Sequence, residues 1–460
     1  MRNRFTSALF RSVLAPVPAL ILAALLVSCA TDGRAYAGVD KAVEVSTFER
    51  GIELIDKAQK SSKPIYPKKN QILLYLDRGL LAHYADMYQE STKDLGQAER
   101  LIEEAFTKSL SADLASYILN DNTKDYAGED YENIYLNVFN ALNYYHLGSL
   151  DDAVVEVRRT NEKLRTLAQE YEKINSEMKE KYRNNLSGLN VPAAKPVNFN
   201  NSALADYLGA LFYRADGAYD DARINLLQLK DAFITAPNVY QNPIPASLVL
   251  SGEEGSETAE ELQIPENEAR INLLCFTGLS PIKKENDITF PLPFSYGLDL
   301  AHLRLPELVP RADTVTSVEL VADDGKKIEL ELLEDMGKAV QETYNAKYNT
   351  VFLKTLIRVV VKYASVYVIA EATAQSSESE LAGSLAALAA KITFDATENA
   401  DIRMERYLPA KAWIGAVNLE PGAHTITINY YSGSRKIGSE ERTIQAETGR
   451  LNLLEGICLK

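Results

Sequence analysis

The stretch ALNYYHLGSLDDAVVEV, residues 141–157, decides the fold of the first half of the chain. It places Gly148 between two runs of residues with helical spacing, and small side chains recur in both runs. This pattern predicts two antiparallel helices, because glycine accommodates the chain reversal and small residues let the helices approach closely. Two other stretches repeat the pattern, from Gly79 to Ala98 and from Ala210 to Leu226.

The three units resemble tetratricopeptide repeats, with departures at Ser91, where the family has an alanine, and at Asp86, where it has a turn glycine. The units lie farther apart than the roughly 34 residues of that repeat, so we expect additional helices between them. Residues 151–184 are rich in Glu, Lys and Arg and predict a solvated arm that extends past the repeat. The resemblance implies a helical domain over residues 41–245.

The first helices of such repeats line a concave groove that binds peptides or proteins. The groove positions of the family fall on Leu76, His83, Tyr84, Tyr135, Tyr145, His146, Tyr207 and Arg214. Aromatic side chains with polar tips suit the recognition of a partner. Alternatively, these tyrosines pack between helices or against the next domain. The two histidines imply no metal, because they lie far apart in the sequence and lack a carboxylate at ligand spacing.

The first thirty residues have the pattern of a secretory signal. Three arginines, at positions 2, 4 and 11, precede an apolar stretch over residues 13–27. This stretch is shorter than the roughly 20 residues of a membrane span, and it contains two prolines. It ends in Leu26-Val27-Ser28-Cys29, which resembles the lipobox of bacterial lipoproteins. We therefore predict a signal peptide over residues 1–28, lipidation of Cys29, and a tether over residues 29–40.

Lipidation predicts a protein that is anchored to the bacterial envelope and does not span the membrane. Each buried methylene of an acyl chain contributes about 0.8 kcal/mol, so several palmitate-type chains hold the protein to the bilayer. Ala30 follows the cysteine where an aspartate would, by resemblance to enteric lipoproteins, indicate retention in the inner membrane. The outer membrane is therefore favoured, and both periplasmic and surface exposure stay open.

Composition excludes several other classes. The 460 residues contain 49 Lys plus Arg and 64 Asp plus Glu, and the net charge of −15 argues against a nucleic-acid partner. Three cysteines cannot make a disulfide framework, and no zinc-ligand spacing is present. The acidic residues Asp121, Asp125, Glu129 and Asp130 lack the ligand order of a calcium loop, so we interpret them as a helix-capping, solvated loop.

The second half of the chain predicts a β-sandwich-like domain over residues 269–460. An acidic linker is expected over residues 246–268, because this segment has few large apolar side chains. Short β-prone runs follow at 271–276, 315–321, 328–333, 412–419, 424–431, 436–444 and 451–457. Turn sequences separate several of them, at residues 323–325, 420–422 and 432–434. The expected fold class is α+β, with a helical insertion at about 334–400 that interrupts the sandwich.

In the insertion, apolar residues nearly encircle a helix over Val351–Ala374 and leave Lys354, Arg358 and Lys362 as a basic stripe. One interpretation is a second membrane anchor. The other is a central helix between the domains whose stripe pairs with acidic neighbours, which avoids the cost of three cations within a bilayer.

The mature chain as a whole resembles a family of bacterial envelope lipoproteins with degenerate tetratricopeptide-like repeats. The matching stretches are Leu119–Thr123, Tyr126–Glu132, Thr277–Lys284, Ala400–Arg403 and Arg406–Pro409. Met404 and Glu405 stand where relatives have a tryptophan between the two arginines. Arg403 and Arg406 are expected to complement the end of a helix and to bridge to the strand domain. Members encoded beside lipoproteins that activate cell-wall synthases imply a role in envelope assembly.

No nucleophile motif, metalloprotease motif, phosphate loop or dinucleotide fingerprint occurs in the sequence, so we expect neither enzymatic activity nor a cofactor. The leading hypothesis is a membrane-tethered scaffold whose groove binds envelope proteins or peptides. The alternative is an accessory solute-binding lipoprotein that holds a small ligand between the two domains, near Arg358 and Lys362. A degenerate wall-active hydrolase is a third possibility.

Overall fold

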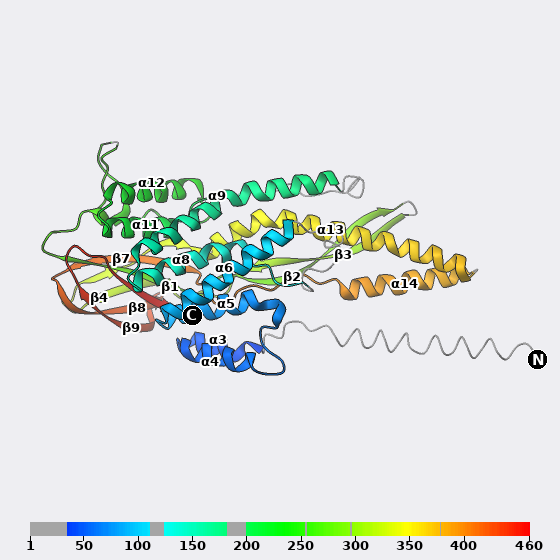
Figure 1. Ribbon diagram of the computed structural model, residues 1–460, viewed down its shortest axis with the longest axis horizontal. Helices are drawn as coiled ribbons and strands as arrows, with labels where there is room; N and C mark the ends of the chain where they lie inside the picture. The colour runs from blue at the N-terminus through cyan, green and yellow to red at the C-terminus, as the bar shows by residue number, and fades with distance from the viewer. Residues whose placement is uncertain (1–34, 111–123, 182–198, 254, 295–296, 378) are drawn as a thin grey trace, which may run out of the picture.

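The computed structural model describes residues 35–110, 124–181, 199–253, 255–294, 297–377 and 379–460. Within these ranges the chain has the expected α+β fold (Figure 1). The predicted signal peptide, Cys29 and most of the tether lie outside the described residues, as do Asp121 and the 119–123 stretch.

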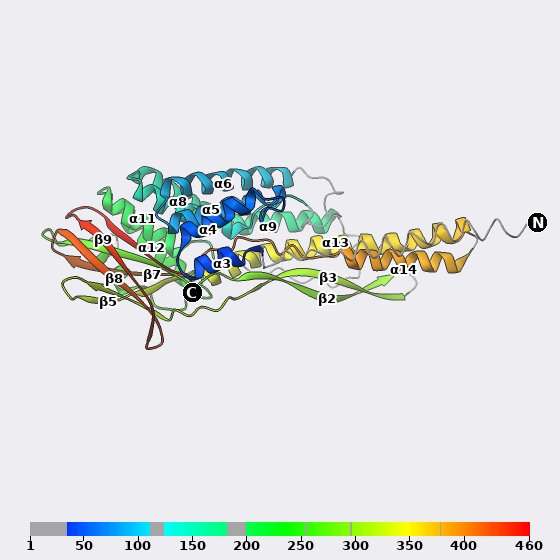
Figure 2. The ribbon, with the colours of Figure 1, turned by 90° about the horizontal axis from the view of Figure 1, so that it is seen from below.

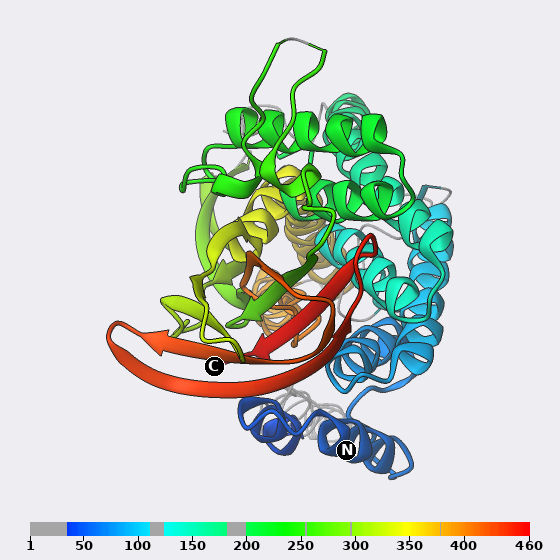
Figure 3. The ribbon, with the colours of Figure 1, turned by 90° about the vertical axis from the view of Figure 1, so that its left-hand side faces the viewer.

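The helical domain consists of antiparallel hairpins. The first pair is α3 (Ala37–Glu44) and α4 (Phe48–Gln59), so helix already begins within the segment predicted to be a tether. The three hairpins expected from the sequence pattern are α5 (Gln71–Tyr84) with α6 (Tyr88–Leu110), α8 (Asp130–His146) with α9 (Leu150–Lys181), and α11 (Ala203–Ala215) with α12 (Tyr219–Thr235). Figure 3 shows these hairpins as an arc around the strands.

The turns of the three hairpins use the conformation that their sequences predicted. Asp86, Gly148 and Gly217 have positive φ values of 58°, 78° and 76°, a region that glycine adopts freely and aspartate tolerates. The unusual Ser91 also has a structural role. Its hydroxyl donates to the Gly79 carbonyl at 2.8 Å and accepts from Asn143 Nδ2 at 2.8 Å, so it joins the first hairpin to the second.

The long helix α9 does extend past its repeat, but it is not solvated all round. Thr350 Oγ1 of α13 (Met336–Ser377) donates to Asn175 Oδ1 at 2.8 Å, and Ile174 packs beside Leu353 and Ile357. The sparse apolar residues of the arm therefore form one face that packs on a second helix, which its overall polarity did not reveal.

Two four-stranded sheets form the predicted sandwich. One has the order β10-β1-β7-β6 and the other β5-β4-β8-β9. The strands are β1 (Ala269–Thr277), β4 (Ser317–Ala322), β5 (Lys327–Glu329), β6 (Glu331–Asp335), β7 (Lys411–Leu419), β8 (Gly422–Ser432), β9 (Arg435–Ala446) and β10 (Asn452–Cys458). β1 runs parallel to β10 and antiparallel to β7.

All nine residues of β1 are buried, because the strand has a protein layer on each face. Leu273 and Cys275 face the sandwich core with Ile426 of β8, whereas Leu274 and Phe276 join the core of the helical domain. The apolar run at residues 273–276 follows from that position, because both faces of the strand are covered. One sheet of the sandwich is thereby packed into the arc of helices.

A long hairpin of β2 (Ile282–Phe294) and β3 (Gly297–Val309) was not expected from the sequence. It forms a separate two-stranded sheet, where the prolines that disfavour a central strand are tolerated because both strands are edges. Leu303 and Leu305 of β3 pack against Phe352 and Leu356 of α13.

The helical insertion is present between β6 and β7. It consists of α13 and α14 (Glu380–Thr397), which run side by side away from the sandwich (Figures 1 and 2). Gly383 allows their close contact, since a Cβ there would meet the Ala370 carbonyl oxygen at 2.6 Å. Within the described part of the chain, no helix combines the length and apolar character that a membrane span requires.

The segment between the domains is described except at residue 254. Residues 246–268 contain two short 3-10 turns, Ala246–Leu248 and Glu260–Leu262, and an isolated bridge between Ser251 and Thr258. Glu261 is 1% exposed. Glu261 therefore has fixed contacts within the acidic linker, and the composition did not reveal them because its partners, Arg214 and Arg270, lie outside the linker.

Candidate functional site

Seven of the eight predicted groove positions make hydrogen bonds or ion pairs with the second half of the chain. Leu76 is fully buried. The Tyr84 hydroxyl donates to the Tyr407 carbonyl at 2.9 Å, and the Tyr145 hydroxyl donates to the Leu451 carbonyl at 2.9 Å. These two tyrosines therefore pack against the next domain, which is the alternative to a groove that binds a partner. We call the eight positions with their partners the closed inner face.

Two histidines of the closed inner face share one carboxylate. His83 Nε2 lies 3.0 Å from Glu455 Oε2, and His146 Nε2 lies 2.7 Å from Glu455 Oε1. Asn143 Oδ1 contacts the second ring nitrogen of His83 at 2.7 Å, and Tyr88 stacks on His146. The cluster joins α5 and α8 to β10.

Burial alone would lower the pKa of His83, but the charge of Glu455 and the hydrogen bonds to the ring outweigh it and raise the pKa. Burial likewise opposes ionisation of Glu455, yet the two imidazoles hold the pKa of this carboxyl well below its usual range. The arrangement therefore favours an ionised carboxylate beside protonated imidazole, which is a charge-assisted contact between domains.

Tyr135 contacts a second buried carboxylate, that of Glu334 in β6. The Tyr135 hydroxyl donates to Glu334 Oε1 at 2.6 Å, and the Tyr240 hydroxyl donates to Oε2 at 2.8 Å. The Ser202 hydroxyl and the Leu204 backbone N–H, at the start of α11, donate to the same carboxylate. Four donors satisfy this group, so it fixes the third hairpin to the sheet.

Arg214 pairs with a third carboxylate, Glu261, and Tyr207 is linked to it through Asn272. The Arg214 guanidinium pairs with Glu261 and donates to Asn272 Oδ1 of β1 at 2.9 Å, and Asn272 Nδ2 donates to the Tyr207 hydroxyl at 3.2 Å. Arg270 pairs with the other oxygen of Glu261 at 2.9 Å. The Glu261 carboxylate thus pairs with two buried arginines, and Glu260 pairs with Arg270 as well, at 3.1 Å.

No family model, curated protein or solved structure matches this chain.

The segment around Arg403 and Arg406 bridges to the helical domain, not to the strand domain as expected. The Arg406 backbone N–H donates to Asp77 at 2.7 Å, and its guanidinium pairs with Asp40 at 2.8 Å. Arg403 Nη1 donates to Asn70 Oδ1 at 3.1 Å. The reason is that α14 ends at Thr397, so both arginines lie in an extended segment that crosses the helices.

The acidic stretch before α8 does cap that helix, through a capping box between Glu129 and Glu132. Glu129 is buried, however, and not solvated. It pairs with Lys283 and, at 3.0 Å, with Lys347. Burial would raise the pKa of Glu129, but the two lysines lower it overall. Among the described residues, no group of three or more His, Cys, Asp or Glu side chains could hold a metal ion.

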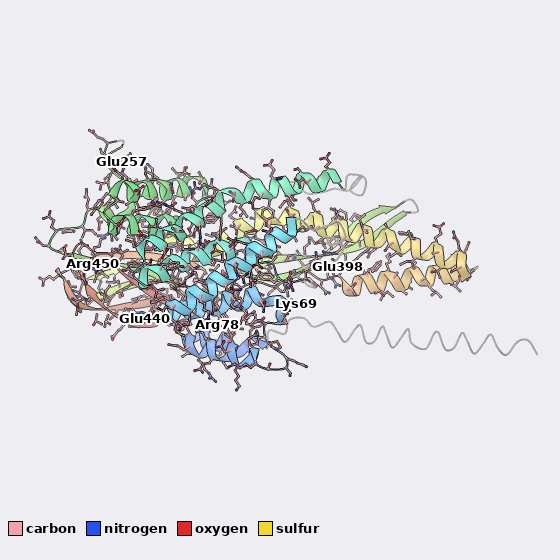
Figure 4. The ribbon with its side chains drawn as sticks, viewed as in Figure 1. Lys69, Arg78, Glu257, Glu398, Glu440 and Arg450 are labelled. Carbon is pink, nitrogen blue, oxygen red and sulfur yellow. The ribbon has the colours of Figure 1, made fainter. Side chains whose placement is uncertain are left out.

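The predicted ligand contacts Arg358 and Lys362 are both occupied by one carboxylate. Arg358 Nε donates to Glu398 Oε1 at 2.7 Å, and Lys362 Nζ donates to Glu398 Oε2 at 2.6 Å. Glu398, labelled in Figure 4, follows the last residue of α14 and lies beside α13. For these two residues, the interpretation of a stripe paired with acidic neighbours is confirmed.

A cavity of about 290 Å³ lies elsewhere at the junction of the two domains. The turns after α3 and α5 form one wall and strands β9 and β10 form the other, with Phe48, Asp86, Glu440 and Arg442 among the lining residues. Arg442 pairs with Asp86 at 3.0 Å across the cavity. Its volume is at the lower limit of small-molecule sites.

The most exposed apolar surface lies on the projecting hairpin. Six of the fourteen exposed large hydrophobic side chains of the described residues belong to α13 and α14. Four of them form a stripe along one side of α14, with exposed fractions of 70%, 59%, 55% and 51%: Leu381, Leu385, Leu388 and Ile392. We call these four residues the α14 stripe. Exposed apolar side chains gathered on one side of a helix make a candidate interaction surface.

The sequence analysis missed the α14 stripe, although a signal was present. The spacing of the four residues is 4, 3 and 4, which is the heptad spacing of a coiled-coil seam. The alanine-rich composition of α14 explains the omission, since it indicates helix without indicating which side is exposed. The carboxylates Glu261, Glu334 and Glu455 had no comparable signal.

Proposed function

We propose that this chain is a lipid-anchored scaffold of the bacterial envelope that offers the α13–α14 hairpin, and not a repeat groove, to its partner. The observation that carries this proposal is the exposed α14 stripe on a hairpin that projects from the body. The repeat groove is a poor candidate, because an incoming protein would have to displace the sandwich from three buried carboxylate clusters.

The lipobox at Leu26–Cys29 supports the location. We place the mature protein in the outer membrane, attached through acyl chains on Cys29 and acting in envelope or cell-wall assembly. Six residue steps separate Cys29 from the first described residue, Ala35, so an extended chain reaches at most about 20 Å. The start of the described chain, at Ala35, therefore stays close to the bilayer.

A binding role fits the chemistry of the described residues better than catalysis does. The thiols of Cys275 and Cys458 are buried in the sandwich core, and burial raises the pKa of both, to about 11 for Cys458. A thiol needs a lowered pKa to act as a nucleophile. The carboxylates of the closed inner face are held by hydrogen bonds to their own chain.

A photo-crosslinking amino acid tests the proposal in cells that express the full-length protein. We expect the crosslinker at Leu388 to yield a covalent adduct with another polypeptide. The matched control is Lys230, an exposed residue of α12, where we expect no adduct. Equal adduct yields at both positions, or none at Leu388, would refute docking through the hairpin.

The cavity at the domain junction favours solute binding as a second candidate function. Its lining includes three glutamates and one aspartate beside Arg442, so a small cationic or zwitterionic solute suits it better than an anion. Native mass spectrometry of protein purified from the envelope tests this candidate. A bound small mass that disappears in the Glu440→Gln variant would support it, and an unchanged protein mass in all preparations would exclude it.

A further inference from the structure

We propose that the α14 stripe pairs with the α14 stripe of a second copy of this chain, in an antiparallel helix pair. The inference rests on the proposed function, because it names the partner of the same hairpin. Heptad spacing fits a helical partner, since such seams interlock with a second helix.

The order of the four aliphatic residues suits a second copy of the chain as the partner. The spacing 4, 3, 4 is the same in both directions, so an antiparallel copy places Leu381 opposite Ile392 and Leu385 opposite Leu388. Each apolar side chain then meets an apolar side chain, as a two-fold symmetric interface requires.

The flanks of the stripe are small or complementary in charge. In the heptad that places Leu385 and Ile392 at a and Leu381 and Leu388 at d, the e and g positions are Ala382, Ser384, Ala389 and Lys391. Small flanks let two helices approach closely. Lys391 is the one charged flank, and its ammonium lies 5.5 Å from the centre of the Tyr363 ring of α13. In the antiparallel pair the same ammonium lies near Glu380 of the second copy, which is exposed in the single chain.

Charge also argues for the antiparallel direction. Each chain has a net charge of −15, and antiparallel hairpins place the two acidic bodies at opposite ends of the helix pair. Parallel hairpins would place them side by side. A two-fold axis along the membrane normal lets both copies keep their anchors in one leaflet.

A lipid surface fits α14 less well than a helix does. Interfacial helices carry Lys and Arg on the polar side and Trp, Phe or Leu on the other. The helix Glu380–Thr397 contains one lysine, no arginine and no tryptophan, and two acidic residues, Glu380 and Asp395. Its charge therefore does not attract an anionic leaflet.

The seam is short. Eighteen residues span about 27 Å, and the stripe alone buries less than the 1,200 Å² or so of a stable interface. Anchoring both copies in one membrane compensates, because confinement raises their effective concentration. The pair is therefore expected on the membrane and is weak in dilute solution.

Disulfide formation in cells tests the pairing in the full-length, anchored protein. Two differently tagged variants, Leu381→Cys and Ile392→Cys, are expressed together and oxidised with copper phenanthroline. We expect at least tenfold more covalent dimer from this mixture than from either variant alone, because like positions lie at opposite ends of the helix pair. Background is low, since Cys275 and Cys458 are buried.

Both positions are exposed, so thermal unfolding of the single variants should match that of the native chain. Absence of a mixed dimer would overturn the inference, and so would equal crosslinking of Leu381→Cys with itself, which indicates parallel helices. An adduct of Leu388 with a different polypeptide, without mixed dimer, would overturn self-pairing and leave the proposed scaffold intact. An adduct of Leu388 with lipid alone would overturn both.

A charge exchange gives a second, independent measurement. Glu380→Lys and Lys391→Glu should each reduce the mixed dimer severalfold, and the double exchange should restore it. Reduction without restoration would contradict the proposed contact between these residues.

Discussion

Replacing Glu455 with glutamine removes the one charge that holds two imidazoles of the helical domain against β10. Hydrogen bonds to charged groups contribute about 1.5–3 kcal/mol each, and neutral ones about 0.5–1.5 kcal/mol. Weakening the two hydrogen bonds to His83 and His146 should therefore lower the free energy of local unfolding by about 2–3 kcal/mol in total. Solvent screening is small, because the side chains of His83 and Glu455 are 2% and 7% exposed.

The loss should depend on pH in a defined direction. A histidine whose pKa is raised by folding stabilises the fold below its unfolded pKa of about 6.5, and this contribution disappears as the pH rises through the folded pKa. A glutamate whose pKa is lowered contributes above its unfolded value of about 4.3. The loss of stability caused by Glu455→Gln should therefore be largest between about pH 4.5 and 6.5 and smaller at pH 8.5.

Hydrogen exchange of the intact chain, read by mass spectrometry on peptides that cover β10, measures this effect. A loss of 2–3 kcal/mol in local stability predicts about 30- to 150-fold faster exchange at pH 6. The matched control is Asp323→Asn, which removes the charge from the surface pair of Asp323 and His424 and should leave β10 unchanged. Acceleration below threefold at pH 6, or equal acceleration at pH 6 and 8.5, would refute the reasoning.

Three other perturbations have defined outcomes. Gly383→Val should push α14 away from Ala370 and lower the local stability of α14 by about 2 kcal/mol. Amide hydrogen exchange in α14 that stays at the native rate would contradict this prediction. Gly456→Ala would bring a methyl group within 2.6 Å of the Tyr430 hydroxyl, so overpacking should lower the urea midpoint of the sandwich by an amount that corresponds to about 1–3 kcal/mol. Cys29→Ser should abolish palmitate labelling and release the protein from the membrane fraction, and retention of either would exclude the anchor.

Local sequence predicted the features of the fold that depend on local sterics. The three helix hairpins follow from a turn residue at positive φ and from small residues on both sides of it, so Gly148 and Gly217 could be recognised without knowledge of the rest of the chain. The same holds for the sandwich turns, where Gly325 and Gly433 have φ values of 89° and 58°.

The contents of the closed inner face could not be predicted in this way. Repeat spacing indicates which side chains face inward, but it does not indicate what fills the space between them. The partner of His83 is 372 positions away and that of Tyr135 is 199 positions away. Each is one acidic residue among 64, so no local pattern distinguishes it.

The most direct measurement of the central claim places a photo-crosslinking phenylalanine at Tyr145 of the full-length protein in living cells. The structure predicts a link within the chain, because Tyr145 contacts Leu451 and Leu453 next to β10. The product should keep the mass of a single chain and join residue 145 to a peptide near residue 451. A product that joins residue 145 to a second polypeptide would contradict the closed inner face and return the groove to the candidates for partner binding.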